Sequence, residues 1–220
     1  MEVRVFFWAP NLVEKMNIKL FKNDLPDELE IKGDLAIDTE AMGLNPHRDP
    51  LCLIQISTGN QDAYLIQFEN RDYSAPNLKK LLNNPDSQKI FHYARFDVAI
   101  IYKYLGIELK NIFCTKIASK LVRTYTDCHG LKDLCRELLN VQISKQQQSS
   151  YWGSEQLTKE QKHYAAADVL HLHDIREILL KMLAREDRLE LFQKCCDFIF
   201  TRAKLDLLGW PESDIFAYKS

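Results

Sequence analysis

Two carboxylates, Asp38 and Glu40, lie near the end of the apolar run LAIDTEAMGL at residues 35–44. In an extended strand, side chains two residues apart project from the same face, about 6.6 Å from each other along the chain. Like charges repel by about 4 kcal/mol at 4 Å for an effective dielectric constant near 20, so a partly buried pair needs a cation or a proton. The pair therefore indicates half of a metal site, although a solvated strand end before a turn would carry the same residues.

Two further acidic residues follow in segments that could present them to the same region. Asp97 lies in FHYARFDVAII, where a strand is expected to pass into a helix, and Asp168 lies in the alanine-rich segment HYAAADVLHLHDI. In a helix, Tyr164 and Asp168 share one face about 5–6 Å apart, so a phenol and a carboxylate are presented together. Taken singly, Asp97 would be a helix N-terminal charge and Tyr164 a half-buried amphipathic residue.

The elements that must position these residues can be predicted from hydrophobic periodicity. Short segments rich in Ile and Leu and bounded by turn formers are predicted to be strands, at 18–22, 34–39, 51–57, 62–66 and 87–93. Helices are predicted over 75–82 and 94–107, the second closed by Gly106. Beyond residue 114 the pattern is almost wholly helical and includes a late helix over 187–208. Its core-spaced residues are Leu189, Phe192, Cys196, Ile199 and Ala203.

Composition narrows the class of protein. The chain has 220 residues, of which 46% are hydrophobic and 27% are charged, as in an ordinary globular domain. The net charge of −2 provides no global attraction to a polyanion, so any nucleic-acid contact would need a local basic groove. Six cysteines without a C-x-x-C pair indicate reduced thiols and a cytoplasmic location, and no apolar run is long enough to span a membrane.

The order D-x-E, then F-H-x-x-x-x-D, then Y-x-x-x-D resembles the three motifs of the DEDD superfamily of 3′–5′ exonucleases, tyrosine subtype. Within it the chain is similar to ribonuclease D, from about Phe21 to Leu172, through DTEAMGL, LCLIQIS, IFHYARFD, SKQQQSSYW and QKHYAAADVLHL. The resemblance implies an α/β, ribonuclease H-like fold. We therefore expect a five-stranded mixed sheet flanked by helices, followed by an all-helical C-terminal part.

The resemblance also implies roles for the acidic residues. Asp38, Glu40 and Asp168 would hold one divalent cation, Asp38 would bridge to a second, and Asp97 would support the second partly through water. All-oxygen ligands suit Mg²⁺ or Mn²⁺, and two such ions about 3.5–4 Å apart can stabilise the attacking and leaving oxygens of a phosphodiester. Tyr164 would orient or deprotonate the attacking water.

His163 competes with Tyr164 for that last role. His163 and Asp168 satisfy H-x-x-x-x-D, the spacing of the histidine subtype of the same superfamily. Helical positions five apart differ by about 140° around the axis, whereas positions four apart differ by about 40°. The A-A-A-D sequence that follows Tyr164 also matches the tyrosine subtype, so we predict that Tyr164 is the catalytic residue.

The same resemblance suggests substrate contacts. Met42 and Leu44 would bracket the terminal nucleotide as an apolar wedge against its base, or would pack in a turn. Tyr151 stands where the family pattern has an Asp, so no role is carried over to it. The other candidates for substrate binding are His92, Lys145 and Trp152.

Basic residues could extend the substrate path. Lys116, Lys120 and Arg123 fall on one helical face and Lys132 and Arg136 on another, which is compatible with a path for phosphates and equally with a solvated surface.

These features predict a metal-dependent 3′–5′ exoribonuclease that releases 5′-mononucleotides from RNA 3′ ends, with transfer-RNA precursors as the substrates implied by the family. The same chemistry on DNA and a catalytically silent RNA-binding module remain alternatives, and the 2′-hydroxyl would distinguish RNA from DNA. Met16 is a plausible true start. We therefore expect an N-terminal appendage over 1–17, an exonuclease domain over 18–208 and a tail over 209–220.

Overall fold

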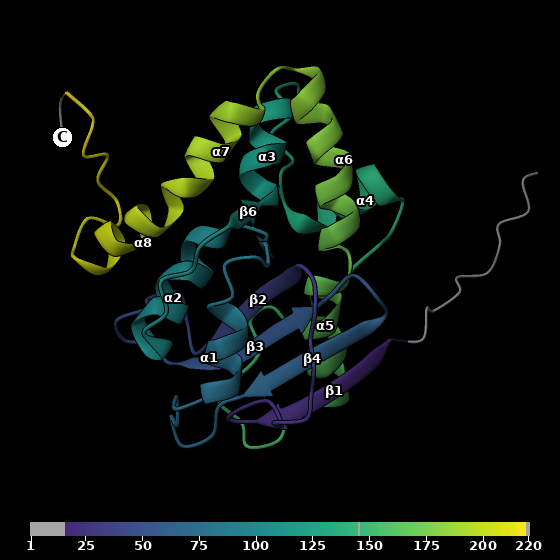
Figure 1. Ribbon diagram of the computed structural model, residues 1–220, viewed down its shortest axis with the longest axis vertical. Coiled ribbons are helices and arrows are strands. Elements are labelled where there is room, and N and C mark those ends of the chain that lie inside the picture. Colours follow the sequence, from purple (N-terminus) through teal and green to yellow (C-terminus); the bar gives the residue numbers. More distant parts are fainter. Residues whose placement is uncertain (1–15, 145, 219–220) are drawn as a thin grey trace, which may run out of the picture.

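The fold is built on a six-stranded mixed sheet with the strand order β1-β4-β3-β2-β5-β6 (Figure 1). The structure, a computed structural model, describes residues 16–144 and 146–218. β2 pairs antiparallel with β3, and β3 with β4, whereas β1–β4, β2–β5 and β5–β6 are parallel pairs. The carboxyl ends of β2, β5 and β6 therefore meet at one edge of the sheet. The strands are β1 Asn17–Lys22, β2 Leu35–Ala41, β3 Leu51–Ser57, β4 Asp62–Gln67, β5 Lys89–Phe91 and β6 Ile112–Cys114.

The expected α/β class is confirmed, but the expected number of five strands is wrong. The additional strand is β6, which pairs with β5 in the register Lys89↔Ile112 and Phe91↔Cys114. Three residues are too few to show a periodicity of their own, so tertiary pairing with β5 makes this segment a strand. β5 is also shorter than the segment 87–93 that the sequence pattern predicts.

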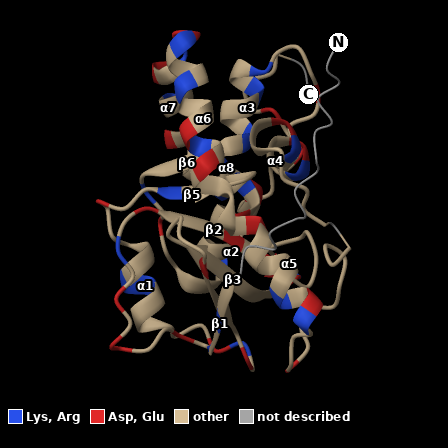
Figure 2. Ribbon diagram, turned by 90° about the vertical axis from the view of Figure 1, so that its right-hand side faces the viewer, with Lys and Arg blue, Asp and Glu red and all other residues tan. Residues whose placement is uncertain are grey.

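Helices cover both faces of the sheet. α5 (Lys159–Leu170) packs on β2, β3 and β4, and Figure 2 shows α1 (Pro76–Leu82) on the opposite side of the sheet from α5. α2 (Ala94–Leu105) follows β5 and ends at Gly106, whose left-handed backbone (φ 71°) is easiest for glycine. β3 lies between these layers, and all seven of its residues are buried, as expected for a strand covered on both faces.

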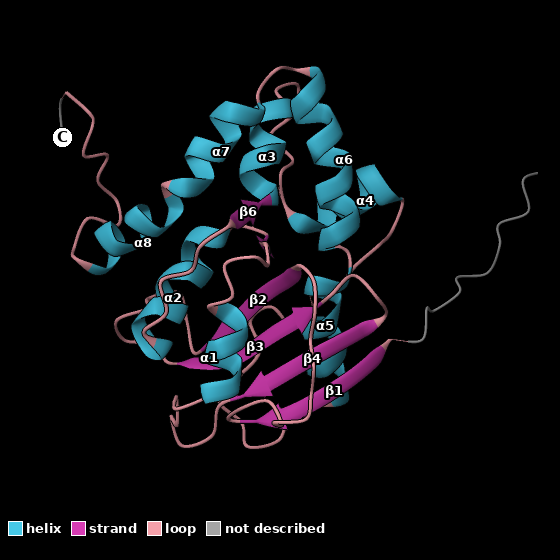
Figure 3. Cartoon of the chain, in the orientation of Figure 1, coloured by secondary structure: helices cyan, strands magenta, loops and turns pink. Residues whose placement is uncertain are grey.

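The C-terminal part is helical, as predicted. Figure 3 shows helices without strands in the region beyond β6. α8 packs on α2, which joins this helical part to the sheet. The helices of this part are α3 Thr115–Val122, α4 Leu131–Leu139, α6 Leu172–Arg185, α7 Leu189–Asp197 and α8 Ile199–Leu207.

The late helix predicted over 187–208 is divided into α7 and α8, which meet at Phe198. Four of its five predicted core residues are buried, because the spacing of apolar positions continues across the break. Leu189 is the exception, since it begins α7 at the surface and is 44% exposed.

The predicted domain limits stay predictions. β1 begins at Asn17, one residue inside the expected appendage, and residues 1–15 lie outside the described part of the chain. Beyond residue 208, the carbonyl of Pro211 accepts a hydrogen bond from Arg95, and the ring of Phe216 lies 6.0 Å from that of Phe198. Among the described residues, no helix combines the length and apolar character needed to cross a bilayer.

Candidate active site

Three carboxylates converge where β2 approaches α5. Each of Asp38, Glu40 and Asp168 offers one oxygen such that these oxygens all lie within 4.8 Å of one another. Asp38 and Glu40 reach this point because alternate residues of β2 share a face. Just after Glu40, the register between β2 and β3 shifts by one residue, an irregularity that is common beside active sites, where it redirects side chains.

Helix α5 places the third carboxylate. The helix begins with a capping box, in which the Thr158 hydroxyl accepts a hydrogen bond from the Gln161 backbone N–H and the Gln161 side chain accepts one from the Thr158 N–H. Ala165 and Ala166 are completely buried, and their small side chains allow the helix to lie close to the sheet. Asp168, two residues further on, therefore reaches the carboxylates of β2.

The raised pKa values of the acidic residues show that these carboxylates repel one another unless a proton or a cation is present. Burial raises the pKa of the Asp38 carboxyl to about 7. Burial and then the charges of Asp38, Asp168 and Asp97 raise the pKa of Glu40 to about 10. These directions are expected when like charges share a partly desolvated site, where either protons or cations must relieve the repulsion. An all-carboxylate donor set of this kind fits a hard divalent cation.

Asp97 lies beside the three-carboxylate group and is held by another contact. Its Oδ1 accepts a 2.6 Å hydrogen bond from the Thr39 hydroxyl, and both side chains are buried. Burial and then the nearby charge of Asp38 raise the pKa of Asp97 well above its usual value. Asp97 is therefore close enough to interact with the site, and its predicted contact with a second ion stays a prediction.

Gln55 is a member of this site that the motifs do not include. It is directly opposite Asp38 in the β2–β3 register, is fully buried, and donates a 3.2 Å hydrogen bond from Nε2 to Asp38 Oδ2. Its Oε1 is buried and has no hydrogen-bond partner among the described residues. The signal in the sequence was a single glutamine inside the otherwise apolar strand LCLIQIS, where an amide must have a polar neighbour.

The phenol of Tyr164 faces the acidic cluster. Burial raises its pKa most, followed by the charges of Asp168, Glu40 and Asp38 and a hydrogen bond with Asp168. The indole of Trp152 packs against it, with ring centroids 6.1 Å apart. This placement favours Tyr164 over His163, and its catalytic role remains a prediction.

The predicted substrate contacts fall into distinct environments. Met42 and Leu44 are 38% and 88% exposed, as a wedge against a base would require. A Cβ added to Gly153 would lie 2.7 Å from Met42 Sδ and 3.1 Å from the Tyr151 hydroxyl, so Met42 and Tyr151 meet over this glycine. Tyr151, which departs from the family pattern, therefore belongs to the rim of the site.

Trp152 and His92 are less accessible than Met42 and Leu44. Trp152 is 2% exposed in a small core with Leu53 and Leu65, so the structure shows it packing, and its predicted contact with substrate stays untested. His92 Nδ1 lies 2.9 Å from the hydroxyl of Thr115 at the start of α3. Lys145 lies outside the described residues.

The expected basic faces are only partly available to a ligand. Arg123 is fully buried and bound to Glu137, and the exposed Arg136 forms ion pairs with Asp133 and Glu137. Arg123 is therefore a structural residue, which corrects its predicted place beside Lys116 and Lys120.

Comparisons with known proteins agree with this geometry. The family profile described as 3′–5′ exonuclease matches residues 17–184. Ribonuclease D of Gluconacetobacter diazotrophicus is 32% identical over 156 residues, which cover 71% of this chain and 39% of that protein. The chain thus spans about two fifths of the length of this curated relative.

Two solved structures match this chain over nearly the full length of both proteins. Brucella melitensis NrnC bound to pGG is 51% identical with a TM-score of 0.89, and the match covers 92% of this chain and 99% of that one. Brucella melitensis NrnC with bound Mg²⁺ is 50% identical with a TM-score of 0.88, over 92% and 100% of the two chains.

The fold and the acidic site define a nuclease of the DEDD type. The chain belongs to the 3′–5′ exonuclease family, and the predicted resemblance to ribonuclease D is confirmed.

Proposed function

We propose that this protein is a divalent-metal-dependent 3′–5′ exoribonuclease that releases 5′-mononucleotides from RNA 3′ ends. The observation that carries the proposal is the convergence of Asp38, Glu40 and Asp168, with oxygens within 4.8 Å of one another, beside the phenol of Tyr164. We place the activity in the cytoplasm, since all six cysteines are free thiols, as is usual in a reducing compartment.

The acidic residues would hold Mg²⁺ or Mn²⁺. Asp38, Glu40 and Asp168 would bind one ion, and Asp38 with Asp97 would support a second. Bound cations of this kind stabilise negative charge on the attacking and leaving oxygens of a phosphodiester. The Mg²⁺-bound NrnC, with half of its residues identical, supports the choice of cation.

The other residues of the site would position the substrate and the water. The Tyr164 phenol, held by Asp168 and by packing on Trp152, would orient the attacking water. Met42 and Leu44 would bracket the 3′-terminal base and align the last phosphodiester with the acids.

RNA is the favoured polymer because the named relatives are ribonuclease D proteins and RRP6 exosome exonucleases. For the length of the RNA, the structure of NrnC bound to pGG favours short 5′-phosphorylated substrates, since pGG denotes a dinucleotide with a 5′-phosphate. Transfer-RNA precursors, implied by the resemblance to ribonuclease D, are the second candidate. The relatives that suggest them are more than twice as long as the matched segment.

Matched substrates test this proposal. The purified protein is incubated with pGG, with an RNA carrying a 3′ overhang, and with the DNA equivalent of each, in Mg²⁺, Mn²⁺ or EDTA. We expect 5′-mononucleotides from the RNAs with either metal and none in EDTA. Cleavage that persists in EDTA contradicts the metal mechanism, faster cleavage of DNA reassigns the substrate, and binding without cleavage identifies a silent module. Asp38→Asn should abolish cleavage, which excludes a contaminating nuclease.

A further inference from the structure

The turn between β2 and β3, residues 42–50, carries the two residues that would bracket the terminal base. The Met42 N–H donates a 3.1 Å hydrogen bond to the carbonyl of Pro50, which closes the base of the turn. Leu44 is 88% exposed, so little of its side chain is packed against the rest of the protein. The position of Leu44 therefore depends on the contacts that hold its backbone.

Asp49 supplies a buried carboxylate to this turn and is only 6% exposed. Its Oδ2 accepts a 3.0 Å hydrogen bond from the Asn45 N–H. In return, the Asp49 N–H donates a 2.8 Å hydrogen bond to the carbonyl of Asn45. An aspartate that accepts from a nearby backbone N–H gives the chain a local substitute for secondary structure. The two bonds hold Asn45 and Asp49 together across the turn.

The same carboxylate lies against the backbone of Gly43. A Cβ added to Gly43 would lie 2.2 Å from Asp49 Oδ2, 2.8 Å from its Cγ and 3.4 Å from its Oδ1. A side chain at position 43 would therefore occupy the space that the carboxylate fills. Gly43 and Asn45 are the two neighbours of Leu44 in the chain. The carboxylate of Asp49 thus contacts the backbone on both sides of Leu44.

Asp49 is itself attached to the body of the protein. Its carbonyl accepts a 3.2 Å hydrogen bond from the hydroxyl of Tyr104 on α2. The ring of Tyr104 lies 5.0 Å from that of Tyr73, whose hydroxyl donates a 2.9 Å hydrogen bond to the carbonyl of Leu51 at the start of β3. The contacts of Asp49 therefore tie the backbone around Leu44 to a helix and to the sheet.

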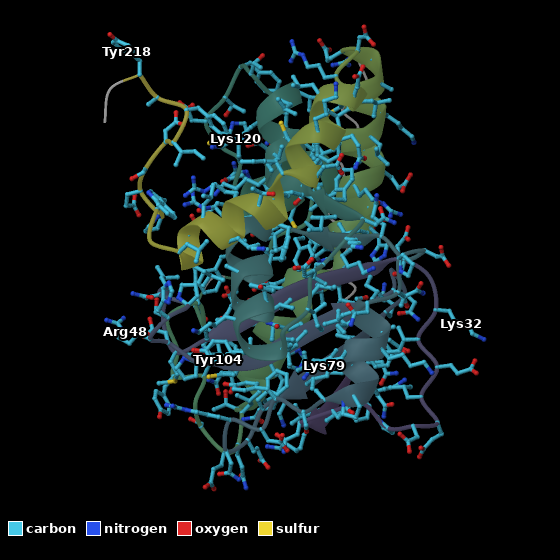
Figure 4. All side chains as sticks on the ribbon, turned by 60° about the vertical axis from the view of Figure 1, so that its left-hand side comes forward. Lys32, Arg48, Lys79, Tyr104, Lys120 and Tyr218 are labelled. Carbon is cyan, nitrogen blue, oxygen red and sulfur yellow. The ribbon has the colours of Figure 1, made fainter. Side chains whose placement is uncertain are left out.

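The ion pair with Arg48 does not account for this arrangement. Arg48 donates hydrogen bonds from Nε and Nη2 to the two oxygens of Asp49, at 2.6 and 2.9 Å. Its side chain is 76% exposed, and Figure 4 shows it at the outer surface of the protein. Ion pairs with a partner exposed to this degree contribute little to stability. The contacts of Asp49 with Gly43 and Asn45 are therefore the ones that shape the turn.

We infer that Asp49 is a positioning residue that holds Leu44 where it meets the 3′-terminal base of the substrate. The inference rests on the proposed function, in which Met42 and Leu44 bracket that base. A side chain that is already held in its bound position loses little freedom when the substrate binds. Without the carboxylate, the turn around Leu44 would have to be ordered at that moment, which weakens binding of a substrate that carries the base.

Kinetics with a matched pair of substrates test the inference. pGG and an analogue whose 3′-terminal ribose lacks its base are compared in Mn²⁺ for the full chain and for Asp49→Ala. We expect the KM for pGG to rise about fivefold, the usual cost of ordering one side chain on binding. The KM for the analogue should stay within about twofold of wild type, because it has no terminal base for Leu44 to contact. An equal rise for both substrates would show a merely structural role and overturn the inference.

Two further substitutions separate the contacts of the carboxylate. Asp49→Asn keeps an oxygen that can accept from the Asn45 N–H, so it should retain the KM for pGG. Arg48→Ala removes the ion pair, leaves the contacts with Gly43 and Asn45 in place, and should behave as the wild type. A rise in KM in Arg48→Ala equal to that in Asp49→Ala would assign the effect to the ion pair and overturn the inference.

Gly43→Ala disturbs the same contact from the other side. The added methyl group must displace the carboxylate of Asp49, so this substitution alone should also raise the KM for pGG. In the Asp49→Ala background it should add nothing, because the three nearest atoms are all removed with the carboxylate. This double-mutant cycle measures the coupling between the two positions. Additive effects would show that Gly43 and Asp49 act independently and would overturn the inference.

Measurements without turnover separate this inference from the proposed function. Hydrogen exchange followed by mass spectrometry should show faster exchange across residues 43–49 in Asp49→Ala, since the Asn45 N–H loses its acceptor. In Glu40→Gln, calorimetric titration should show tighter binding of pGG than of the baseless analogue, and adding Asp49→Ala should reduce the difference.

The outcomes of these measurements are distinct. If the wild type fails to cleave RNA while the preference for the base still depends on Asp49, the proposed function is wrong and the positioning role stands. If RNA is cleaved but Asp49→Ala leaves this preference unchanged, the positioning role is wrong and the function stands. Faster exchange without any change in the preference would make Asp49 purely structural and also overturn the inference.

Discussion

The hydroxyl of Thr39 donates a 2.6 Å hydrogen bond to Oδ1 of Asp97 and thereby ties β2 to the first turn of α2. Thr39 lies between Asp38 and Glu40, so the same three residues of β2 supply two carboxylates to one face and a hydroxyl to the fourth acid. Both partners of the bond are buried. The hydrogen bond from Thr39 thus helps to fix the position of Asp97 beside the site.

Removing the Thr39 hydroxyl should lower both the stability and the activity of the protein. Thr39→Val keeps the shape of the side chain but removes one hydrogen bond from a buried carboxyl, so the free energy of unfolding should fall by about 1–3 kcal/mol. The kcat should fall as well, while Thr39→Ser should retain most of both properties. Urea denaturation and steady-state kinetics measure these changes. A Thr39→Val protein with wild-type stability and kcat would show that the bond has no such role.

Gln55 should act as a positioning residue for Asp38. Gln55→Leu removes the hydrogen bond to Asp38 Oδ2, and loss of a contact that orients a metal ligand typically lowers metal affinity by about 10–100-fold. Stability should change little, because the buried and unpartnered Oε1 is removed with the amide. Calorimetric titration with Mn²⁺ measures the affinity. Ser57→Ala, a polar-to-apolar change two residues further along β3 and opposite Ala36 rather than Asp38, is the control, and an equal loss of affinity there would contradict this role.

Substitutions at Tyr164 and at its neighbour His163 should affect kcat very differently. Tyr164→Phe removes one oxygen that faces the acids and should lower kcat by about 10²–10⁴-fold with little change in KM. His163→Ala should leave kcat within a few-fold of wild type. Single-turnover assays on pGG separate the chemical step from product release. The reverse result would assign the enzyme to the histidine subtype.

The acidic cluster should make the metal-free protein less stable as the pH rises. The pKa of Asp38 is raised to about 7 and that of Glu40 to about 10, so the folded state binds more protons than the unfolded state between about pH 4 and those values. In EDTA, the contribution of these groups to Tm should therefore decline from pH 5 to pH 9. Mn²⁺ should raise Tm most at the upper end of this range, because the ion replaces the protons.

A substitution checks the origin of this effect. Glu40→Gln removes the carboxyl with the higher of these two pKa values and should flatten the dependence of Tm on pH in EDTA. It should also reduce the increase of Tm produced by Mn²⁺. Thermal unfolding followed by circular dichroism provides both measurements, and an unchanged slope in this variant would mean that other groups cause the decline.

Several features of the site could be read from local periodicity. The alternation of β2 places Asp38 and Glu40 on one face, and the turn of a helix places Tyr164 above Asp168. These relationships depend on backbone geometry over two to four residues, so the sequence alone determines them. The α/β class follows in the same way from the order of strand and helix patterns.

Only the tertiary structure decided which distant groups meet. Asp168 reaches Asp38 because the small residues Ala165 and Ala166 let α5 approach the sheet, and the segments involved are separated by about 120 residues of sequence. The burial of Arg123 and the pairing of β6 with β5 were likewise beyond prediction. Such contacts depend on how whole elements pack, and packing is a property of the complete chain that no local pattern encodes.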